Sequence, residues 1–350
     1  MALKKVFQKY FSNLFISIVQ ENNEWIIYSK ILKNGVIKDK FSESFIISED
    51  GSIPPKMEKY LEEFHAKYNF IYVSVFLDSM GQGAISGTSA NDFEKNSIDM
   101  KNVVHFDIDK KWSVYASFID INWVKKLFQS TGIDFIYSPF VIQNVLIKKQ
   151  KSITQPILYI LNHKDSVTIS IFENEELTFG AYFKTTTDDN LSSGEEDWDN
   201  VDEEEGVDNL IELDTIEDDE LGSVDELENL DELDSLDDVE DNDFEDIDSE
   251  RDHNLGHFEG DEESIEEESN LELFGRDILL YKYLNTSLQE FYKNPLYKSN
   301  FIEKVVIFDG YEISSELIEM IEDELLMDIE MNKININEVV CDMSIKEALQ

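Results

Sequence analysis

The feature that most restricts how this chain can fold is a long acidic segment at residues 186–270. The segment holds 40 Asp and Glu residues and a single base, Arg251, whereas the other 265 residues hold 37 acids and 28 bases. Like charges at this density repel one another, and too few aromatic side chains are present to bury an apolar core. We therefore expect the segment to be disordered and to interrupt an ordinary, moderately acidic globular protein.

Apolar residues recur within the acidic segment at every third position between the acids, from Val224 to Val239. A step of three drifts around an α-helix, so these residues form no continuous apolar stripe. The composition fits a solvated spacer. The alternative is a set of acidic-hydrophobic anchors for a basic partner that carries an apolar groove. The anchors would then be Leu227, Leu230, Leu233 and Leu236.

The charge balance and the residue counts exclude several classes of protein. A formal net charge of −48 leaves no clustered Lys and Arg for a nucleic-acid surface. The single cysteine, Cys341, excludes a disulfide framework and cysteine-based zinc sites. The sequence shows no catalytic or metal-binding constellation, no apolar run long enough for a transmembrane helix and no secretory leader. We expect a cytoplasmic protein.

The first 14 residues combine a helical spacing of apolar side chains with the densest bases of the chain. This pattern predicts a short amphipathic helix that packs on the core. The alternative is that the helix contacts a partner or the surface of the membrane. The residues that would make such a contact are Leu3, Lys4, Lys5, Phe7 and Phe11.

The rest of the chain predicts two three-stranded meanders of similar layout, at 15–45 and 157–183. Further strands are expected at 70–77, 103–107, 112–118, 135–137 and 301–308, with a short last strand at 339–340. Helices are expected at 55–68, 121–129, 139–148, 273–292 and 313–324. The Gly- and Ser-rich stretch 79–98 is expected to be a flexible loop or, alternatively, a cradle for a ligand.

This layout resembles the actin-like ATPase fold, an α/β fold with two duplicated, ribonuclease H-like halves that each contain a mixed sheet. In detail it is similar to the type IV pilus assembly family PilM and its type II secretion relative GspL. The stretches that carry the resemblance are Leu3–Phe7, Trp112–Ala116, Thr131–Asp134, Tyr137–Pro139 and Val305–Gly310. The resemblance implies a first half at 1–150 with an inserted subdomain at about 79–118, a second half at 151–185 and 271–350, and the acidic insert at 186–270.

The resemblance also implies where a nucleotide would bind, and the residues at those positions depart from the family pattern. Active members hold the phosphates in two hairpin turns, each with an Asp-x-Gly that positions Mg²⁺ and lets backbone N–H groups approach. Neither turn has Asp-x-Gly here, and Glu21 would repel phosphate. The degenerate positions are Gln20, Glu21, Asn162, His163, Lys164, Asp309 and Gly310. We expect no cofactor and no enzymatic activity.

In function, the resemblance implies a non-catalytic cytoplasmic scaffold at the inner face of the cytoplasmic membrane, in a type IV pilus, type II secretion or DNA-uptake machine. The expected partners are an inner-membrane assembly protein and the motor ATPase of the secretion or pilus system. The main alternative is an actin-like ATPase or sugar-kinase-like enzyme with an atypical nucleotide site. A third hypothesis, a polyanionic decoy that mimics DNA, gives no role to the two ordered halves.

Overall fold

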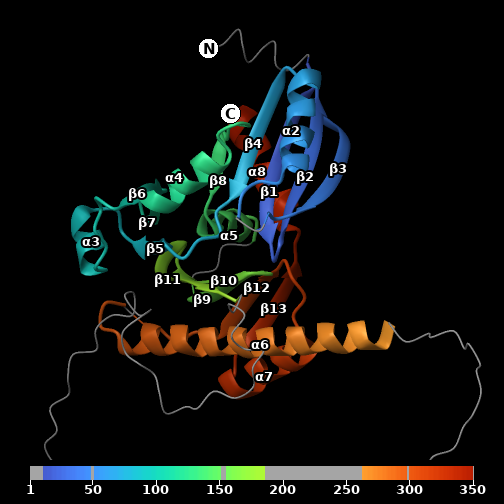
Figure 1. The fold of residues 1–350 in the computed structure, drawn as a ribbon. Coiled ribbons are helices and arrows are strands. Elements are labelled where there is room, and N and C mark those ends of the chain that lie inside the picture. Colours follow the sequence, from blue (N-terminus) through green and yellow to red (C-terminus); the bar gives the residue numbers. More distant parts are fainter. Residues whose placement is uncertain (1–10, 49–50, 151–154, 186–261, 298, 350) are drawn as a thin grey trace, which may run out of the picture. The chain divides into compact units, whose positions relative to one another are not determined.

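The structure is a computed structural model that describes residues 11–48, 51–150, 155–185, 262–297 and 299–349 (Figure 1). By contact the chain divides into two units, and the described residues all belong to the unit formed by residues 1–189 and 262–350. Two groups of predicted contact residues lie outside the described residues, namely Leu3, Lys4, Lys5 and Phe7, and Leu227, Leu230, Leu233 and Leu236.

Two five-stranded mixed sheets with the same strand order form the framework of this unit. In each sheet three strands form an antiparallel meander, and two further strands run parallel to its first strand. The first sheet consists, in spatial order, of β3 (Val36–Ile46), β2 (Glu24–Lys33), β1 (Asn13–Glu21), β4 (Phe70–Phe76) and β8 (Phe135–Tyr137). The second consists of β11 (Glu176–Lys184), β10 (Ser166–Glu173), β9 (Ile157–His163), β12 (Lys304–Asp309) and β13 (Asp328–Lys333).

The helices follow the same duplicated plan. The first half contains α2 (Pro55–Lys67), α4 (Phe118–Leu127) and α5 (Pro139–Ile147), and the second contains α6 (Glu262–Lys293), α7 (Ser315–Leu325) and α8 (Ile336–Leu349). The last helix of each half packs on the sheet of the other half, since α5 contacts β9 and β10 while α8 contacts β1, β2 and β4. The fold is therefore α/β and actin-like (ribonuclease H-like), with two mixed sheets of equal topology.

Burial explains why the central elements have such apolar sequences. β1, β9 and β12 are buried along nearly their whole length, as strands covered on both faces must be. α5 is apolar on all sides because it lies inside the molecule, where Phe140 and Leu146 share one core cluster with Phe308 and Val340 of the second half. The two halves are thus joined by a continuous core.

A small three-stranded sheet lies between β4 and α4 in the chain. Its strand order is β5 (Gln82–Ser86), β7 (Trp112–Ser117) and β6 (Val103–Ile108), and α3 (Ala90–Lys95) precedes β6. The prediction of a flexible loop at 79–98 is therefore wrong, because β5 and α3 lie in this stretch, whereas the alternative of a ligand cradle stays a prediction. Gly83 marks close packing in a strand, because a Cβ there would collide with the hydroxyl of Tyr115.

The C-terminal end differs from the sequence prediction in two further ways. Val339 and Val340 do not form a strand but lie in α8, whose buried residues follow helical spacing. No prediction covers β13, an exposed edge strand whose sequence is mostly charged. At the other end, Leu14 belongs to β1 rather than to an N-terminal helix. α6 begins at Glu262, and so includes the last residues of the predicted acidic segment.

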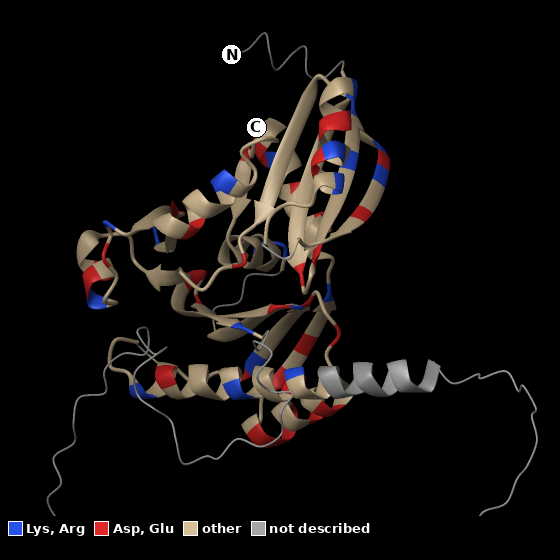
Figure 2. Cartoon of the chain, viewed as in Figure 1, with Lys and Arg blue, Asp and Glu red and all other residues tan. Residues whose placement is uncertain are grey.

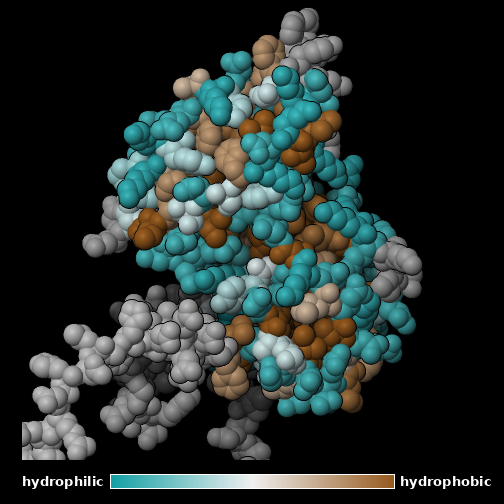
Figure 3. Space-filling view, turned by 90° about the vertical axis from the view of Figure 1, so that its right-hand side faces the viewer, coloured by the Kyte–Doolittle hydropathy of each residue, from teal (hydrophilic) through white to brown (hydrophobic). Residues whose placement is uncertain are grey.

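The surface of the described residues is mixed in charge and in hydropathy. Lys and Arg alternate with Asp and Glu over the helices and strands (Figure 2). On the face shown in Figure 3, hydrophobic side chains form small groups among hydrophilic ones. Among the helices that the structure describes, none is both long and apolar enough to cross a membrane.

One buried lysine ties α8 to the first sheet. The side chain of Lys30 on β2 is 1% exposed, and its ammonium group lies 2.5 Å from Asp342 Oδ1 and 2.9 Å from Glu338 Oε1. The exposed Lys40 of β3 contacts the same Glu338 oxygen at 2.7 Å. Hydrogen bonds from Lys40 and Lys30 lower the pKa of Glu338 to about 2. Burying the Lys30 ammonium costs hydration energy, which these two carboxylates offset.

Replacing Lys30 by Ala is expected to lower the free energy of unfolding by about 2–3 kcal/mol, because a buried ion pair loses one partner. The matched control is Lys40→Ala, an exposed partner of the same carboxylate, for which we expect a much smaller loss. Urea denaturation followed by circular dichroism measures both values. Equal losses for the two variants would show that burial of Lys30 does not hold α8.

Candidate functional site

The hairpin turns that hold phosphates in active actin-like proteins meet each other between the two halves of this chain. The β1–β2 turn contains Asn22, and the β9–β10 turn contains Lys164 and Asp165. Asn22 has a φ of 50°, a left-handed conformation that Asn tolerates in a tight hairpin. This turn directs the backbone N–H of Asn22 toward the opposite half, where its acceptor is a side chain of the protein itself.

Asp165 is the acceptor for the first turn. The backbone N–H of Asn22 donates to Asp165 Oδ2 at 2.5 Å. The side-chain amide of Asn22 has one orientation in which both its nitrogen and its oxygen find partners. In that orientation the nitrogen donates to Asp165 Oδ1 and the oxygen accepts from Lys164 Nζ, both at 2.9 Å. Asp165 is 2% exposed, and burial raises the pKa of its carboxyl group. Both carboxylate oxygens thus accept hydrogen bonds from Asn22 of the first turn.

His163 lies in the same turn region and is almost completely buried. Its Nε2 atom is 3.8 Å from Glu21 Oε1 and has no hydrogen-bond partner among the described residues. Burial lowers the pKa of His163 to about 4, so its imidazole is neutral near pH 7. Burial also raises the pKa of Glu21. The Nδ1 atom of His163 lies 3.4 Å from the hydroxyl oxygen of Ser166, at the start of β10.

Arg276 of α6 occupies the inner side of the β9–β10 turn. Its Nε atom donates to the backbone oxygen of Lys164 at 3.0 Å, and its Nη2 atom donates to Asn162 Oδ1 and to the backbone oxygen of His163. Its guanidinium lies 4.7 Å from the centre of the Tyr311 ring, within the range of a cation–π contact. A protein side chain therefore fills the space beside the turn.

Asp309 and Gly310, at the end of β12, close the site from the second sheet. Asn162 donates to Asp309 Oδ1 at 2.7 Å, and the backbone N–H of Gly310 donates to the backbone oxygen of Asn162 at 2.8 Å. A Cβ on Gly310 would lie 2.7 Å from Ile336 Cδ1, so this glycine serves the packing of α8. The strand end is bonded to its neighbours, and Gly310 also lines a small pocket beside the first turn.

Asp78 adds a further buried link between the halves. It follows β4, accepts a hydrogen bond from the hydroxyl of Tyr182, and lies 2.5 Å from the ammonium group of Lys184 on β11. Burial is the largest single influence and would raise the pKa of Asp78, but Lys184, His163 and Tyr182 together outweigh burial, and the pKa lies below its ordinary value. Asp78 is therefore a charged anchor for β11.

The remaining cavities are small. A pocket of about 200 Å³ lies beside the first turn, with Glu21, Tyr28, Gly310 and Asn337 among its lining residues. Small-molecule sites usually measure about 300–1,000 Å³. In the part of the chain that the structure describes, no group of three or more His, Cys, Asp or Glu side chains could hold a metal ion. The pocket beside the first turn is thus smaller than a usual small-molecule site.

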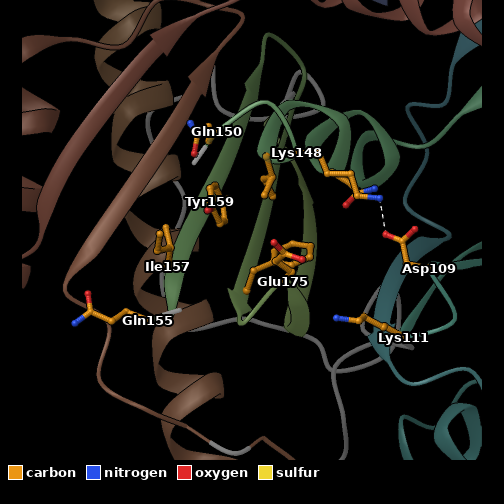
Figure 4. A pocket seen from close by; sticks show the side chains of 11 residues that line it. Asp109, Lys111, Lys148, Gln150, Gln155, Ile157, Tyr159 and Glu175 are labelled. Carbon is orange, nitrogen blue, oxygen red and sulfur yellow. Dashed lines mark hydrogen bonds and ion pairs between the residues drawn. The ribbon is translucent and has the colours of Figure 1, made fainter. Parts of the chain in front are cut away.

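A second pocket, of about 260 Å³, lies at the end of α5 and is shown in Figure 4. Lys148 on its rim is paired with Asp109, and Lys111 lies 3.3 Å from Glu176. Tyr159 and Ile157 form part of its apolar wall. The lysines are already paired with acids of the protein, so the pocket presents no free cation to an anionic ligand.

The structure brings together most of the positions that the sequence analysis singled out. Glu21, Asn162, His163, Lys164, Asp309 and Gly310 form one neighbourhood, and Gln20 pairs with Trp25 at the end of β1. Arg276 and Asp78 are additions that the sequence did not indicate. Phe11, the described member of the predicted N-terminal contact residues, is 43% exposed, and its ring lies 6.0 Å from that of Phe70.

The fold and the site define an actin-like protein whose two nucleotide turns bind each other. The chain belongs to the family described as a domain of unknown function, DUF8341, whose model matches residues 158–349. A second model, also described as a domain of unknown function, DUF8569, matches residues 11–144. No curated protein matches the sequence. The two family matches correspond to the two halves of the fold.

Several solved structures are similar to this chain at low identity. A Bacteroides thetaiotaomicron protein with an actin-like ATPase fold and unknown function is 10% identical, with a TM-score of 0.45 over 97% of this chain and 96% of that one. The PilM–PilN type IV pilus biogenesis complex contains a chain that is 11% identical, with a TM-score of 0.48 over 96% and 97%. A Ppx/GppA family member from Aquifex aeolicus is 8% identical, with a TM-score of 0.26 over 49% and 51%.

Removing the Arg276 guanidinium is expected to destabilise the protein strongly, because three acceptors of the β9–β10 turn lose their donor. For Arg276→Ala we expect the free energy of unfolding to fall by about 3 kcal/mol. The control is Lys282→Ala, an exposed position on the same helix, with an expected change within about 0.5 kcal/mol. Urea denaturation measures both. A loss for Arg276→Ala no larger than that of the control would contradict the bonding described.

The buried neutral His163 is expected to make the protein less stable in acid. Its folded pKa of about 4 lies below the ordinary value of 6.5, so the unfolded chain binds a proton first as pH falls through this window. The resulting loss, about 3 kcal/mol between pH 6.5 and pH 4, should be absent in His163→Gln. Carboxyl groups common to both proteins cancel in the difference.

The control for this experiment is the exposed His65 on α2, since His65→Gln should follow the pH dependence of the wild type. Denaturant midpoints at several pH values provide the measurement. If His163→Gln and the wild type lose stability in parallel, then His163 is not held neutral by burial.

Proposed function

We propose that this protein is a non-catalytic scaffold built on the actin-like fold. The observation that carries the proposal is the direct bonding of the two turns, Asn22 to Asp165, with Arg276 seated against the second turn. Phosphate binding in this fold needs free backbone N–H groups in both turns and a carboxylate that can order Mg²⁺. In this protein the N–H of Asn22 and the oxygens of Asp165 satisfy each other.

The links between the halves also favour a fixed body over an opening and closing enzyme. A nucleotide-driven cycle requires the cleft to open for exchange. Opening would break the turn contacts, the Lys30 ion pair with α8 and the Asp78 contact to Lys184 on β11. Each of these involves buried polar groups, whose separation without new partners is costly. We propose that the halves stay together as one rigid platform.

For the partners we propose the setting that the sequence resemblance implies. The scaffold would lie in the cytoplasm at the inner face of the cytoplasmic membrane and couple an inner-membrane assembly protein to a motor ATPase of a pilus, type II secretion or DNA-uptake machine. The high negative charge of residues 186–270 suits a partner with a basic surface. The alternative remains an actin-like ATPase or sugar-kinase-like enzyme with an atypical nucleotide site.

The decisive test is titration calorimetry of the full chain with Mg-ATP. We expect no heat of binding at millimolar nucleotide, because the groups that would bind phosphate and Mg²⁺ are bonded to each other. A nucleotide-binding actin-like protein, titrated in the calorimeter under the same conditions, serves as the positive control. A micromolar dissociation constant, or ATP hydrolysis above the buffer rate, would refute the non-catalytic function and favour the enzyme.

A further inference from the structure

The small sheet ends in a strand with one free edge. Among the described residues β6 pairs with β7 alone, and the order β5-β7-β6 places it on the side away from β5 (Figure 1). A free edge presents unpaired backbone N–H and C=O groups to another chain. Proteins usually protect such edges with charged or proline residues, but β6 reads Val103-Val104-His105-Phe106-Asp107-Ile108. Asp107 is the only Asp, Glu, Lys or Arg residue of the strand.

The apolar side chains of β6 are unusually exposed. Val104 and Phe106 point to the same face and are 45% and 67% exposed. On that face, their neighbours Ala116 and Val114 on β7 are buried by the body of the protein. The exposed apolar surface continues onto α4, where Phe118 bonds to the backbone oxygen of Asn102 and Ile119 is 77% exposed. Clustered apolar exposure of this kind marks an interaction surface.

The charge around β6 permits a second copy of the chain to approach. Residues 90–127 carry six lysines and six acids, and so are neutral within a chain of net charge −48. β3, the free edge of the first sheet, carries Lys38, Asp39, Lys40 and Glu43. Charges along an edge oppose the addition of another strand. β6 is therefore better suited than β3 to pairing between two copies of this acidic protein.

We propose that the protein forms a symmetric dimer in which β6 pairs antiparallel with β6 of a second copy, centred on His105. This register places Val104 opposite Phe106 of the second copy, on the same face. It also brings Lys101, before the strand, toward Asp109 of the second copy, after the strand. Both contacts occur twice because a two-fold interface repeats each of them. The two small sheets then form one continuous six-stranded sheet.

The inference goes beyond the scaffold function and does not depend on it. The partner is a second copy of this chain because one register pairs the apolar residues of β6 with each other and the charged residues beside β6 with each other. A strand from a different protein would need no such self-complementarity. Dimerisation should strengthen with added salt, because the two chains repel each other through their net charge. Binding of a basic partner would show the opposite dependence on salt.

Sedimentation equilibrium of the full chain tests the proposal. We expect a dimer in the micromolar range and, for Phe106→Asp, a dissociation constant raised by about tenfold or more, since an apolar contact made twice becomes a repulsive one. The matched control is Phe301→Asp, which replaces a phenylalanine of similar exposure, 69%, far from β6 in the chain and should leave the dimer intact. A monomeric wild type, or equal effects of the two variants, would overturn the proposal.

A cysteine at residue 105, on the two-fold axis of the proposed dimer, tests the register of the β6–β6 pairing. His105→Cys should form a disulfide-linked dimer on mild oxidation, because the two Cβ atoms of residue 105 would face each other. The native Cys341 is buried and its pKa is raised to about 12, so it does not compete. Ile46→Cys, at an exposed site on β3, is the control for random collisions. Crosslinking of His105→Cys no faster than that of Ile46→Cys would overturn the proposed register.

Discussion

The bond between the backbone of Asn22 and the carboxylate of Asp165 is the contact on which the character of this protein depends. In an actin-like fold these two turns lie across a ligand, and their polar groups would otherwise be unsatisfied. Here each turn satisfies the other, and Arg276 satisfies the carbonyl groups behind the second turn. These contacts join the two halves of the fold directly through their turns.

Much of the framework could be predicted because its signals are local. Alternation, hairpin turns and apolar runs identify both meanders, and the strand order then follows from two equal halves. The failures have physical causes. β13 is an exposed, charged edge strand whose order comes from pairing with β12. β5 was predicted to be a loop, but its Gly83 makes room for Tyr115 of a strand about 30 residues later.

The site shows a similar division between local and distant information. The loss of Asp-x-Gly in both turns was visible in the sequence, and the structure places those turns together. Arg276 could not be predicted as part of the site, since it follows the acidic segment by only a few residues and contacts a turn more than a hundred positions earlier. Asp78 likewise reads as a polar residue after a strand, and only folding brings Lys184 to it. Long-range polar pairing leaves no periodic signal.

The close approach of β5 to β11 has a mechanical consequence. A Cβ on Gly180 of β11 would lie 3.0 Å from the backbone oxygen of Ala84 on β5, so the two strands nearly touch. The small sheet belongs to the first half by sequence, yet it packs directly against the second half. Tension applied at β6 would pass through β7 and β5 into β11 and the second sheet, without crossing the junction at the two turns. A pull on the small sheet would therefore apply force to both halves of the protein at once.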